Sequence, residues 1–567
     1  MKKPATLLYG SDDRPPLPIT ALTGLQHAGV NAIFLLIPLL VCREGGLAPG
    51  QIVDVLSAAM LLQAVVTAVQ AYPVGPIGAG LFCPAIYTAA YLGPSLAALK
   101  VGGLSLVFGM TIFAGLMQCA LARLLPYLRA LFPSEVAGLI IILIGFTNGT
   151  IGVRYLLGAG ESRAVDGTDL AIGFLSLGVM IALNVWTKGP PRVFCGMIGL
   201  AVGYVTAVAL GRLGSADLQA LASAPVANVP NIAHVGWSFD GALSITFAVA
   251  ALSTTTKAMG IVTSYQKLND ATWTRPDMRS VGGGVLADGL GTTAAGLIGS
   301  TGMNPSASSL GLTTATGVAS RAVALAVAGV FVVLAFLPKA AMVLAIMPRA
   351  VIGAALIFTA AFVLVNGLEV VTSRILDARR ALMIGLALTA AAAVDVFPQF
   401  FATLPPFLRP FFVSSLAAGT LVALGLNAIF RLGVRQTRRL RIDPAKVDSD
   451  AVHEFLAAQG ATWGARRDVI ERAGFNLAQS IETIVDGCEP EGPLDVEASF
   501  DEFNLNVQIS YAGAPLELPA SRPTNEEIVT SEDGQRRLAG FLLRRQADRV
   551  QASHRAGRST ILFHFDH

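Results

Sequence analysis

The residues with the clearest chemical potential lie where long apolar stretches of the chain are interrupted. The segment Gly299–Arg321 is rich in Ser, Thr and Gly, yet it separates two apolar segments. A second interruption, Tyr72–Pro84, lies in the first half of the chain. Lipid cannot hydrogen-bond to loose backbone, so such breaks persist at membrane depth only where protein buries them or where they line a watery cavity. Paired breaks in two halves of a chain are typical of the midplane binding site of a secondary transporter.

The elements that must position these breaks are predicted to be membrane-spanning helices. Of the 567 residues, 53% are hydrophobic and only 14% are charged, whereas roughly 25% of the residues in a soluble domain are charged. Apolar runs follow one another through residues 18–434, each long enough to span a bilayer core of about 30 Å. The fourteen expected spans are 19–42, 50–71, 80–98, 103–124, 135–157, 169–187, 194–211, 239–263, 283–300, 306–317, 320–337, 341–366, 380–397 and 409–430. The third and tenth are too short or too broken to be complete helices.

Composition excludes several other classes of protein. A net charge of +3 is too small to suggest a nucleic-acid partner. The five cysteines form no CxxC pair and have no histidine at ligand spacing, so neither a disulfide framework nor a zinc site is expected. No cofactor is expected, although H⁺ or Na⁺ is a possible coupling ion. No cleavable signal peptide is expected, because the first apolar run is a full span.

The distribution of basic residues predicts the orientation in the membrane. With fourteen spans, both termini lie on one side, and the loops on that side hold more Lys and Arg, for example Lys188, Arg192 and Lys267. Short cytoplasmic loops carry such an excess, so residues 1–17 and the C-terminus are expected in the cytoplasm. A miscount by one short segment would reverse half of the loops.

The composition changes near Arg441, and residues 443–567 are predicted to form a separate cytosolic α+β domain. Val452–Ile484 has a helical pattern, and Leu494–Phe500 and Asn504–Ser510 alternate like the strands of a hairpin. Arg536–Val550 is predicted to be a helix and Ser559–Phe565 a final strand.

Several motifs in residues 18–434 resemble those of the nucleobase–ascorbate transporters, the xanthine/uracil permeases. Gln26-His27 resembles the Gln-His motif of the first helix, and Ala287–Thr292 (ADGLGT) resembles a stretch of the ninth. Ser309 and Gly311 with Thr316 lie where that family has Asn-x-Gly-x-x-x-x-Thr.

The resemblance implies a fold of two inverted seven-helix repeats, with a short strand and a half-helix in segments 3 and 10. Core helices 1–4 and 8–11 would move against gate helices 5–7 and 12–14 in an elevator-like, alternating-access mechanism, usually in a homodimer. It also implies secondary transport of xanthine, urate or uracil and no enzymatic reaction.

The departures from that family concern the expected site. Ser308 stands where a Gln or Glu usually opens the tenth-segment motif, and Ser309 stands in place of Asn. Lys257 occupies the position of a carboxylate that grips the substrate ring. A lysine near mid-bilayer costs roughly 2.5–3.5 kcal/mol on insertion scales, so it needs a partner or a task. Either Lys257 attracts an anionic substrate, or it forms a structural ion pair with Asp288 or Asp395, or it snorkels to the interface.

The remaining candidates also have two interpretations each. His27 and Gln26 either contact substrate or support the half-helices by hydrogen bonds, and Phe82 either stacks on a substrate ring or packs in a core. Thr256 either lines the cavity or bonds to its own helix backbone. Asp288 is expected to tie the ninth helix to its neighbours. The substrate-binding set is therefore Gln26, His27, Phe82, Thr256, Lys257, Ser308, Ser309 and Gly311.

The C-terminal region weakly resembles the histidine-kinase-like ATPase domains of anti-sigma regulators, mainly in Arg536–Phe565. The helix that should carry Glu-x-x-x-Asn has Ala478 and Glu482 at those places, and no glycine-rich phosphate loop is present. A degenerate regulatory or dimer-stabilising domain is therefore favoured over an ATPase, and a sulfate-transporter-like regulatory domain is the alternative.

Two rival functions stay open for the whole chain: an exchanger of inorganic or small organic anions, and a membrane sensor that signals through the C-terminal domain.

Overall fold

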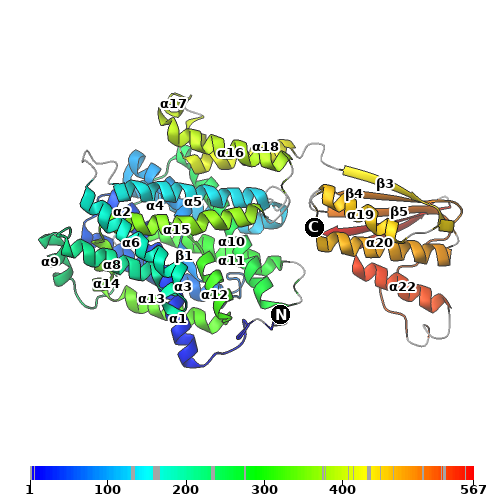
Figure 1. The fold of residues 1–567 in the computed structure, drawn as a ribbon, viewed down its shortest axis with the longest axis horizontal. Helices are drawn as coiled ribbons and strands as arrows, with labels where there is room; N and C mark the ends of the chain where they lie inside the picture. The colour runs from blue at the N-terminus through cyan, green and yellow to red at the C-terminus, as the bar shows by residue number, and fades with distance from the viewer. Residues whose placement is uncertain are drawn as a thin grey trace. The chain divides into compact units, whose positions relative to one another are not determined.

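The computed structural model describes residues 3–5, 7–128, 134–157, 166–230, 236–271, 273, 276–372, 376, 378–405, 408–412, 414–430, 436–446, 449–463, 465, 467–488, 490–500, 504–524, 527, 532–555 and 557–566. Two compact units are present, a helical unit that ends at Leu426 and a C-terminal unit that begins at Asn427, with a short earlier segment assigned to the latter. Figure 1 shows the helices and strands of each unit.

The helical unit consists of α-helices, three short 3-10 helices and two short strands. Its first-half helices are α1 (Leu17–Ala32), α2 (Leu36–Glu44), α3 (Pro49–Ala71), α4 (Leu92–Leu128), α5 (Ser134–Leu157), α6 (Gly167–Trp186), α7 (Pro190–Val193), α8 (Cys195–Ala209) and α9 (Ser215–Ser223). Those of the second half are α10 (Gly241–Asn269), α11 (Met278–Leu297), α12 (Ala307–Thr316), α13 (Arg321–Ala335), α14 (Pro338–Ala345), α15 (Arg349–Val371), α16 (Ala378–Val396), α17 (Pro398–Ala402) and α18 (Ser415–Phe430). The 3-10 helices are η1 (Ile33–Leu35), η2 (Ala89–Tyr91) and η3 (Arg409–Phe412).

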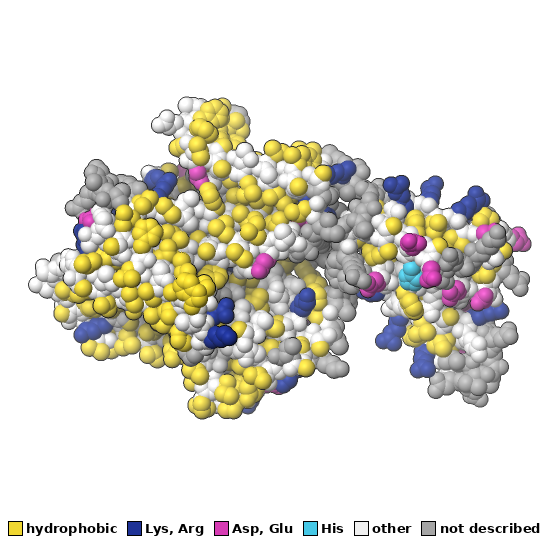
Figure 2. All heavy atoms as spheres, viewed as in Figure 1, with side chains coloured by type: hydrophobic (Ala, Val, Ile, Leu, Met, Phe, Trp, Pro, Cys, Tyr) yellow, Lys and Arg dark blue, Asp and Glu magenta, His cyan; other side chains and the backbone are white. Residues whose placement is uncertain are grey.

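Among the described residues, seven helices are long and apolar enough to cross a membrane, or eight if the bent pair α13 and α14 forms one span. The surface agrees with this, because Figure 2 shows extensive hydrophobic side chains over the helical unit and many charged ones on the C-terminal unit. Several expected spans differ from the observed helices. Span 80–98 contains β1 (Ala85–Tyr87), η2 and the start of α4, and span 341–366 is divided between α14 and α15, with Pro348 as the N-cap of α15. A proline ring supplies no N–H to a continuing helix, so the chain starts a new helix there.

One short strand follows the first broken stretch directly, another lies within the second, and these two strands pair. Strand β1 (Ala85–Tyr87) lies antiparallel to β2 (Met303–Pro305), with Ile86 opposite Asn304. Backbone bonds extend the pairing on both sides, since Thr88 N donates to the Gly302 carbonyl at 3.0 Å and Ser306 N to the Pro84 carbonyl at 2.9 Å. The pairing joins segments from opposite halves of the chain and satisfies backbone groups that lipid could not.

Side chains from the flanking helices satisfy the outer edges of this two-stranded sheet. On β1, Gln63 Nε2 donates to the Ala85 carbonyl at 3.0 Å and Ala85 N donates to Thr67 Oγ1 at 3.1 Å. On β2, Met303 N donates to Thr292 Oγ1 at 3.0 Å. Gln63, Thr67 and Thr292 are fully buried, so the sheet edges are closed by helices α3 and α11.

Half-helix α12 begins immediately after β2 because Ser306 caps it. Ser306 Oγ accepts a bond from Ser309 N at 3.1 Å, the usual role of an N-cap serine. The same hydroxyl donates to Asn31 Oδ1 on α1 at 2.8 Å, and the Ser309 hydroxyl donates to that oxygen at 3.2 Å. Asn31 thereby fixes the first turn of α12 against α1.

The N-terminal segment docks at the other end of this half-helix. Leu8 N and Tyr9 N donate to the Gly317 carbonyl, and Ala319 N donates to the Tyr9 carbonyl at 2.8 Å. Asp12 forms an ion pair with Arg321. The residues before α1 therefore hold the turn between α12 and α13.

Helices α5 and α15 pack closely along small residues. A Cβ added at Gly152 would lie 3.0 Å from the Gly353 carbonyl oxygen, and one at Gly353 would lie 2.7 Å from the Gly152 carbonyl oxygen. Small residues allow helix backbones in membranes to approach this closely. A side chain at either position would push the two helices apart.

The C-terminal unit is a five-stranded antiparallel sheet with helices on one face. Its strands are β3 (Gln436–Ile442), β4 (Leu494–Phe500), β5 (Asn504–Ala512), β6 (Arg549–Arg555) and β7 (Arg558–Asp566), in the order β3-β4-β5-β7-β6. Its helices are η4 (Pro444–Lys446), α19 (Ser449–Trp463), α20 (Arg467–Cys488) and α22 (Glu532–Gln546). The strand β3 precedes residue 443, so the sheet includes residues before the boundary inferred from composition.

One predicted helix of this unit ends early. The helix expected over Arg536–Val550 ends at Gln546, and Arg549–Arg555 is strand β6 instead. The reason is tertiary, because β6 pairs with β7 along its whole length, from Arg549 opposite His564 to Arg555 opposite Arg558. Both hairpin strands predicted before it are present, as β4 and β5.

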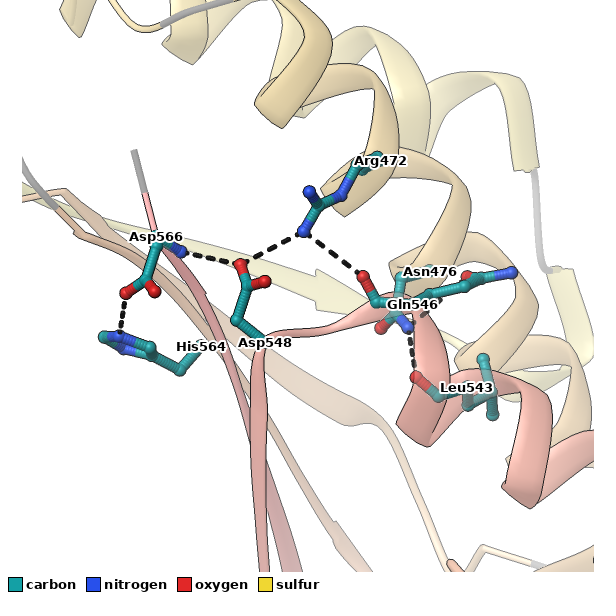
Figure 3. A network of polar contacts seen from close by, with 7 residues as sticks. All are labelled: Arg472, Asn476, Leu543, Gln546, Asp548, His564 and Asp566. Carbon is teal, nitrogen blue, oxygen red and sulfur yellow. Dashed lines mark hydrogen bonds and ion pairs between the residues drawn. The ribbon is translucent and has the colours of Figure 1, made fainter. Parts of the chain in front are cut away.

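A polar network joins α20 to the end of α22 and to the last hairpin (Figure 3). Arg472 lies 3.1 Å from Asp548, whose carboxylate also accepts a bond from Asp566 N at 2.9 Å. Asn476, which is buried, donates to the Leu543 carbonyl at 2.9 Å and contacts Gln546. The inner face of α20 is therefore occupied by contacts within the domain.

The cap of α12 makes a testable prediction about stability. Replacing Ser306 by Ala removes both the cap and the bond to Asn31 and should cost about 1–3 kcal/mol of folding free energy. Thermal unfolding of the purified protein should therefore start at a lower temperature, and Ser306→Thr, which keeps the hydroxyl, should restore most of the loss. Ser264→Ala is the matched control, because the Ser264 hydroxyl is exposed and bonds only to Gly260 of its own helix among the described residues. Equal midpoints for the Ser306→Ala and Ser264→Ala variants would contradict the capping role.

Candidate functional site

The paired strands bring the starts of two helical segments together inside the protein. Thr88 caps η2, which leads into α4, and Ser306 caps α12. At a helix start the first N–H groups have no partner within the helix, and the helix dipole adds partial positive charge there. Two such ends in one place favour a carbonyl oxygen or an anion as ligand. The α4 half-helix then ends at Gly102 and Gly103, which are not helical.

His27 and Phe82 meet beside this junction, as two members of the predicted set. Both are fully buried, and their rings make an edge-to-face contact with centroids 4.7 Å apart. Phe82 also contacts the ring of Tyr265 on α10, at 6.4 Å. Neither ring nitrogen of His27 has a hydrogen-bond partner among the described residues. His27 therefore carries unused hydrogen-bonding capacity at the point where α1, the first break and α10 converge.

The two serines of the tenth segment point in different directions. Ser309 is fully buried and bonds to Asn31, so its side chain supports the half-helix. Ser308 and Gly311 are exposed, one turn apart on the same side of α12. A Cβ added to Gly311 would meet no atom within 4 Å. Ser308 and Gly311 thus border open space, whereas Ser309 does not.

Lys257 lies on α10, partly exposed. No ion pair or hydrogen bond to its ammonium group is present within the part of the chain that the structure describes. Asp288 is close enough to attract it electrostatically without forming a contact ion pair. The ion pair considered as an alternative is thus absent at contact distance in this conformation. Lys257 is a cation held in the protein with its hydrogen-bonding capacity free.

The neighbouring threonines use their hydroxyls locally. Thr256 Oγ1 donates to the Leu252 carbonyl at 3.0 Å, and Thr255 Oγ1 to the Ala251 carbonyl at 2.8 Å. Thr254 is more central, since its carbonyl accepts a bond from Asn304 of β2 at 2.8 Å. Thr256 remains able to accept a hydrogen bond but has its proton engaged within α10.

Gln26 is half-buried on α1, next to His27. Its amide makes no hydrogen bond to any of the described residues. Helices α1 and α10 both pack against α12. The polar groups of Gln26, Lys257 and Ser308, which remain free, therefore belong to α12 and to two helices that pack against it.

Two residues missed by the sequence analysis organise this region. Asn31 anchors Ser306 and Ser309, and it lies one helical turn after His27, a spacing that would have placed both on one face. Gln70 lies just before the first break and joins three elements. Its amide nitrogen donates to the Gly284 carbonyl at 2.9 Å and to Asp288 at 3.0 Å, and its oxygen accepts from Ala79 N at 3.2 Å.

Asp288 was expected to tie its helix to its neighbours, and its bond to Gln70 of α3 confirms this. It is fully buried, and its second carboxylate oxygen has no hydrogen-bond partner among the described residues. The helices α3 and α11 are also joined through the first break, where Gly78 N donates to the Gly283 carbonyl at 2.8 Å. Gly78 has φ of 113°, and a Cβ there would lie 2.2 Å from the Val69 carbonyl oxygen, so only glycine fits this approach.

Comparison with known proteins identifies relatives along most of the chain. The model of the xanthine/uracil permeases, described as the permease family, matches residues 19–400. The chain is 29% identical to a purine permease of Clostridium perfringens, over 75% of this chain and 93% of that protein. It is 26% identical to the xanthine permease XanP of Escherichia coli, over 75% of this chain and 94% of that protein. A xanthine permease of Bacillus subtilis is 25% identical over 73% of this chain and 94% of its own length.

Among solved structures, the transmembrane domain of the cyanobacterial bicarbonate transporter BicA has a TM-score of 0.46 and 15% identity, covering 74% of this chain and 99% of that one. The anion transporter family member SLC26A9 has a TM-score of 0.47 and 13% identity, covering 75% of this chain and 67% of that one. These distant likenesses carry no functional information. The sequence match, in contrast, covers the whole region that holds both broken segments. The chain therefore belongs to the xanthine/uracil permease family and is an integral membrane permease rather than an enzyme.

Proposed function

We propose that this permease is a secondary active transporter of nucleobases of the xanthine, urate or uracil type, and that it takes up the oxopurines xanthine and urate as anions. The names of its relatives support the substrate class, since they are xanthine and purine permeases. The observation that carries the anionic form is the Lys257 ammonium, which makes no contact ion pair or hydrogen bond among the described residues and lies on α10, a helix that packs against α12 and β2.

Several positive groups act together at the proposed site. Helix starts at η2 and α12 contribute partial positive charge, and Lys257 adds a full charge in a low-dielectric interior. Oxopurines lose a ring N–H proton more readily than uracil does, so an anionic ring is available near neutral pH. The deprotonated ring accepts hydrogen bonds from Lys257 and from the N–H groups at the start of α12. The unpaired polar groups of Gln26, His27 and Ser308 supply further bonds.

The proposed architecture is fourteen segments arranged as two inverted repeats of seven. The helix packing supports this. In the proposed repeats α3 corresponds to α11, and the second part of α4 corresponds to α13. The contact of α4 with α11 is therefore equivalent to the contact of α13 with α3, and both contacts are present. In the same way, α5 and α15 are equivalent fifth segments that pack on each other. Alternating access then occurs when a core domain (segments 1–4 and 8–11) slides against a gate domain (segments 5–7 and 12–14) in a homodimer, with both termini in the cytoplasm.

Exchange of inorganic anions is the second candidate, and the free Lys257 ammonium favours it as well. Nucleobases differ from inorganic anions in size and shape, and a planar ring needs a stacking surface as well as positive charge. The buried aromatic ring of Phe82, next to the junction, is suited to a ring substrate if the site opens there. Purified protein in liposomes should therefore exchange labelled xanthine for unlabelled xanthine and should not exchange it for bicarbonate or sulfate.

The C-terminal domain is proposed to be a degenerate regulatory domain without nucleotide hydrolysis. Asn476 and Arg472, on the helix where a nucleotide motif would lie, are engaged with Leu543 and Asp548 inside the domain. Titration of the full chain with Mg-ATP should show neither binding heat nor phosphate release. Saturable ATP binding would contradict this assignment and would revive the sensor interpretation.

Replacing Lys257 should separate anionic from neutral substrates. The Lys257→Met variant loses one charge-assisted interaction of about 1.5–3 kcal/mol, so the apparent affinity for xanthine should fall about 10- to 100-fold. Lys257→Arg should retain much of the affinity. The measurement is concentration-dependent uptake of labelled xanthine into proteoliposomes, at pH values below and above the ionisation of the ring.

Lys267→Met is the control, because Lys267 is an exposed lysine of the same helix. The apparent affinity of the wild-type protein for xanthine should increase as the pH rises and the ring ionises. The Lys257→Met variant should lose this pH dependence. Undiminished uptake of neutral uracil by the Lys257→Met variant, together with unchanged xanthine uptake, would contradict an anion-binding role.

Breaking the link between Gln70 and Asp288 should impair both stability and transport. Gln70→Leu removes three buried hydrogen bonds and leaves Asp288 without this partner, a loss of about 1.5–3 kcal/mol for the bond to the carboxylate alone. The unfolding midpoint and the rate of uptake should both fall. Gln399→Leu, at an exposed glutamine of α17, should change neither. Normal uptake by the Gln70→Leu variant would show that the α3–α11 link is dispensable.

A further inference from the structure

A cavity with a volume of about 390 Å³ lies away from the junction of the half-helices. It is bordered by the first two turns of α3, by α9 and the chain that follows it, and by α14. Helix α3 begins where the first span, Leu17–Glu44, has already crossed the membrane. The cavity is therefore at the face of the molecule opposite the start of α1. In Figure 1, α9 and α14 lie at the left end of the helical unit.

The polar groups of this cavity come mainly from one face of α3. Asp54 and Ser57 both line it and are spaced by three residues, which places them on the same side of the helix. Ser57 is 2% exposed, and its hydroxyl has no hydrogen-bond partner among the described residues. Asp54 is half-buried and forms no ion pair or hydrogen bond with any residue that the structure describes. A buried hydroxyl normally finds a partner, so the free Ser57 group indicates that something else completes the site.

The rest of the wall is largely apolar. Hydrocarbon side chains from α3, from the chain after α9 and from α14 form most of it: Val53, Ala224, Val229, Pro338 and Met342. Asn228 and Ser223 are the other polar contributors, and both are engaged: Asn228 Oδ1 accepts a bond from Val229 N, and Ser223 Oγ donates to the Ala220 carbonyl at 3.2 Å. Among the described residues, no lysine, arginine or histidine lines the cavity. The site thus combines one carboxylate with one free hydroxyl against a hydrocarbon surface.

This combination selects among chemical classes of ligand. An anion would be repelled by Asp54. A bare metal ion needs about six oxygen ligands at short distance, and the cavity offers too few and is too wide. A small organic cation fits, because its ammonium group can bind the carboxylate and hydroxyl while its hydrocarbon body fills the apolar part.

We propose that this cavity is a binding site for a small organic cation with a primary ammonium group and a compact apolar body. The ammonium donates to Asp54 and to Ser57 Oγ, and the body packs between Val53 and Met342. The ligand would contact both α3 and the connection between α8 and α10. The site is independent of the nucleobase site proposed above, since it shares no residue with it.

Benzylamine is a suitable probe, and benzyl alcohol is its neutral counterpart of nearly the same shape. Binding to the purified full-length protein is measured by titration calorimetry and by the unfolding midpoint, which a ligand of the folded state raises. Benzylamine should bind saturably and raise the midpoint, whereas benzyl alcohol should do neither. Asp54→Asn should weaken benzylamine binding about tenfold or more, the loss of one charge-assisted hydrogen bond.

Two further variants test the proposal if the Asp54→Asn protein does not fold. Ser57→Ala should weaken benzylamine binding to a smaller extent, and Glu369→Gln, at an exposed carboxylate of α15, should leave it unchanged. The proposal is overturned if benzylamine does not bind the wild-type protein at millimolar concentration. It is equally overturned if benzyl alcohol binds as well as benzylamine, or if both α3 variants bind it like the wild type.

Discussion

The pairing of β1 with β2 is the interaction on which the rest of the helical unit depends. A chain that breaks its helix within a membrane must satisfy each exposed N–H and C=O group, because an unpaired one costs several kcal/mol in hydrocarbon. Here each broken stretch supplies partners for the other, and Gln63, Thr67 and Thr292 complete the outer edges. The two broken stretches are therefore stable only as a pair. Their helix starts face inward as a result, and a polar ligand can use groups that would otherwise be a liability.

Polar side chains near this junction divide into supporting and free groups. Asn31 and Gln70 have their hydrogen bonds directed at the backbone of the broken segments or at the residues that cap them, and Asn304 of β2 donates from its side chain to the Thr254 carbonyl. His27, Gln26 and Lys257 lack such partners among the described residues. The supporting groups make the geometry rigid, and the free groups are the ones available to a substrate. This division explains why Ser309 and Ser308, adjacent in sequence, have different surroundings.

Sequence alone was sufficient for the features that follow from local composition. The two polar breaks, the apolar spans and the hairpin at Leu494–Phe500 could be predicted because each has a pattern over several consecutive residues. Strand β6 could not, since Arg549–Arg555 is extended only through its pairing with β7. The partner of Asp288 was also hidden, because Gln70 lies more than 200 residues away and amphipathic spacing gives no indication of which helix packs opposite. For Lys257, the sequence left the ion pair open, and only the positions of α10 and α11 decided against contact.

The register between Ala85 and Pro305 also constrains how the protein can be made. The two strands are separated by more than 200 residues, and at roughly 5–20 residues per second the ribosome needs on the order of 10 to 40 s to bridge them. Throughout that interval, strand β1 of the emerging first half has no β2 strand with which to pair. Biogenesis of this permease is therefore completed late, when the second half arrives to close the structure of the first.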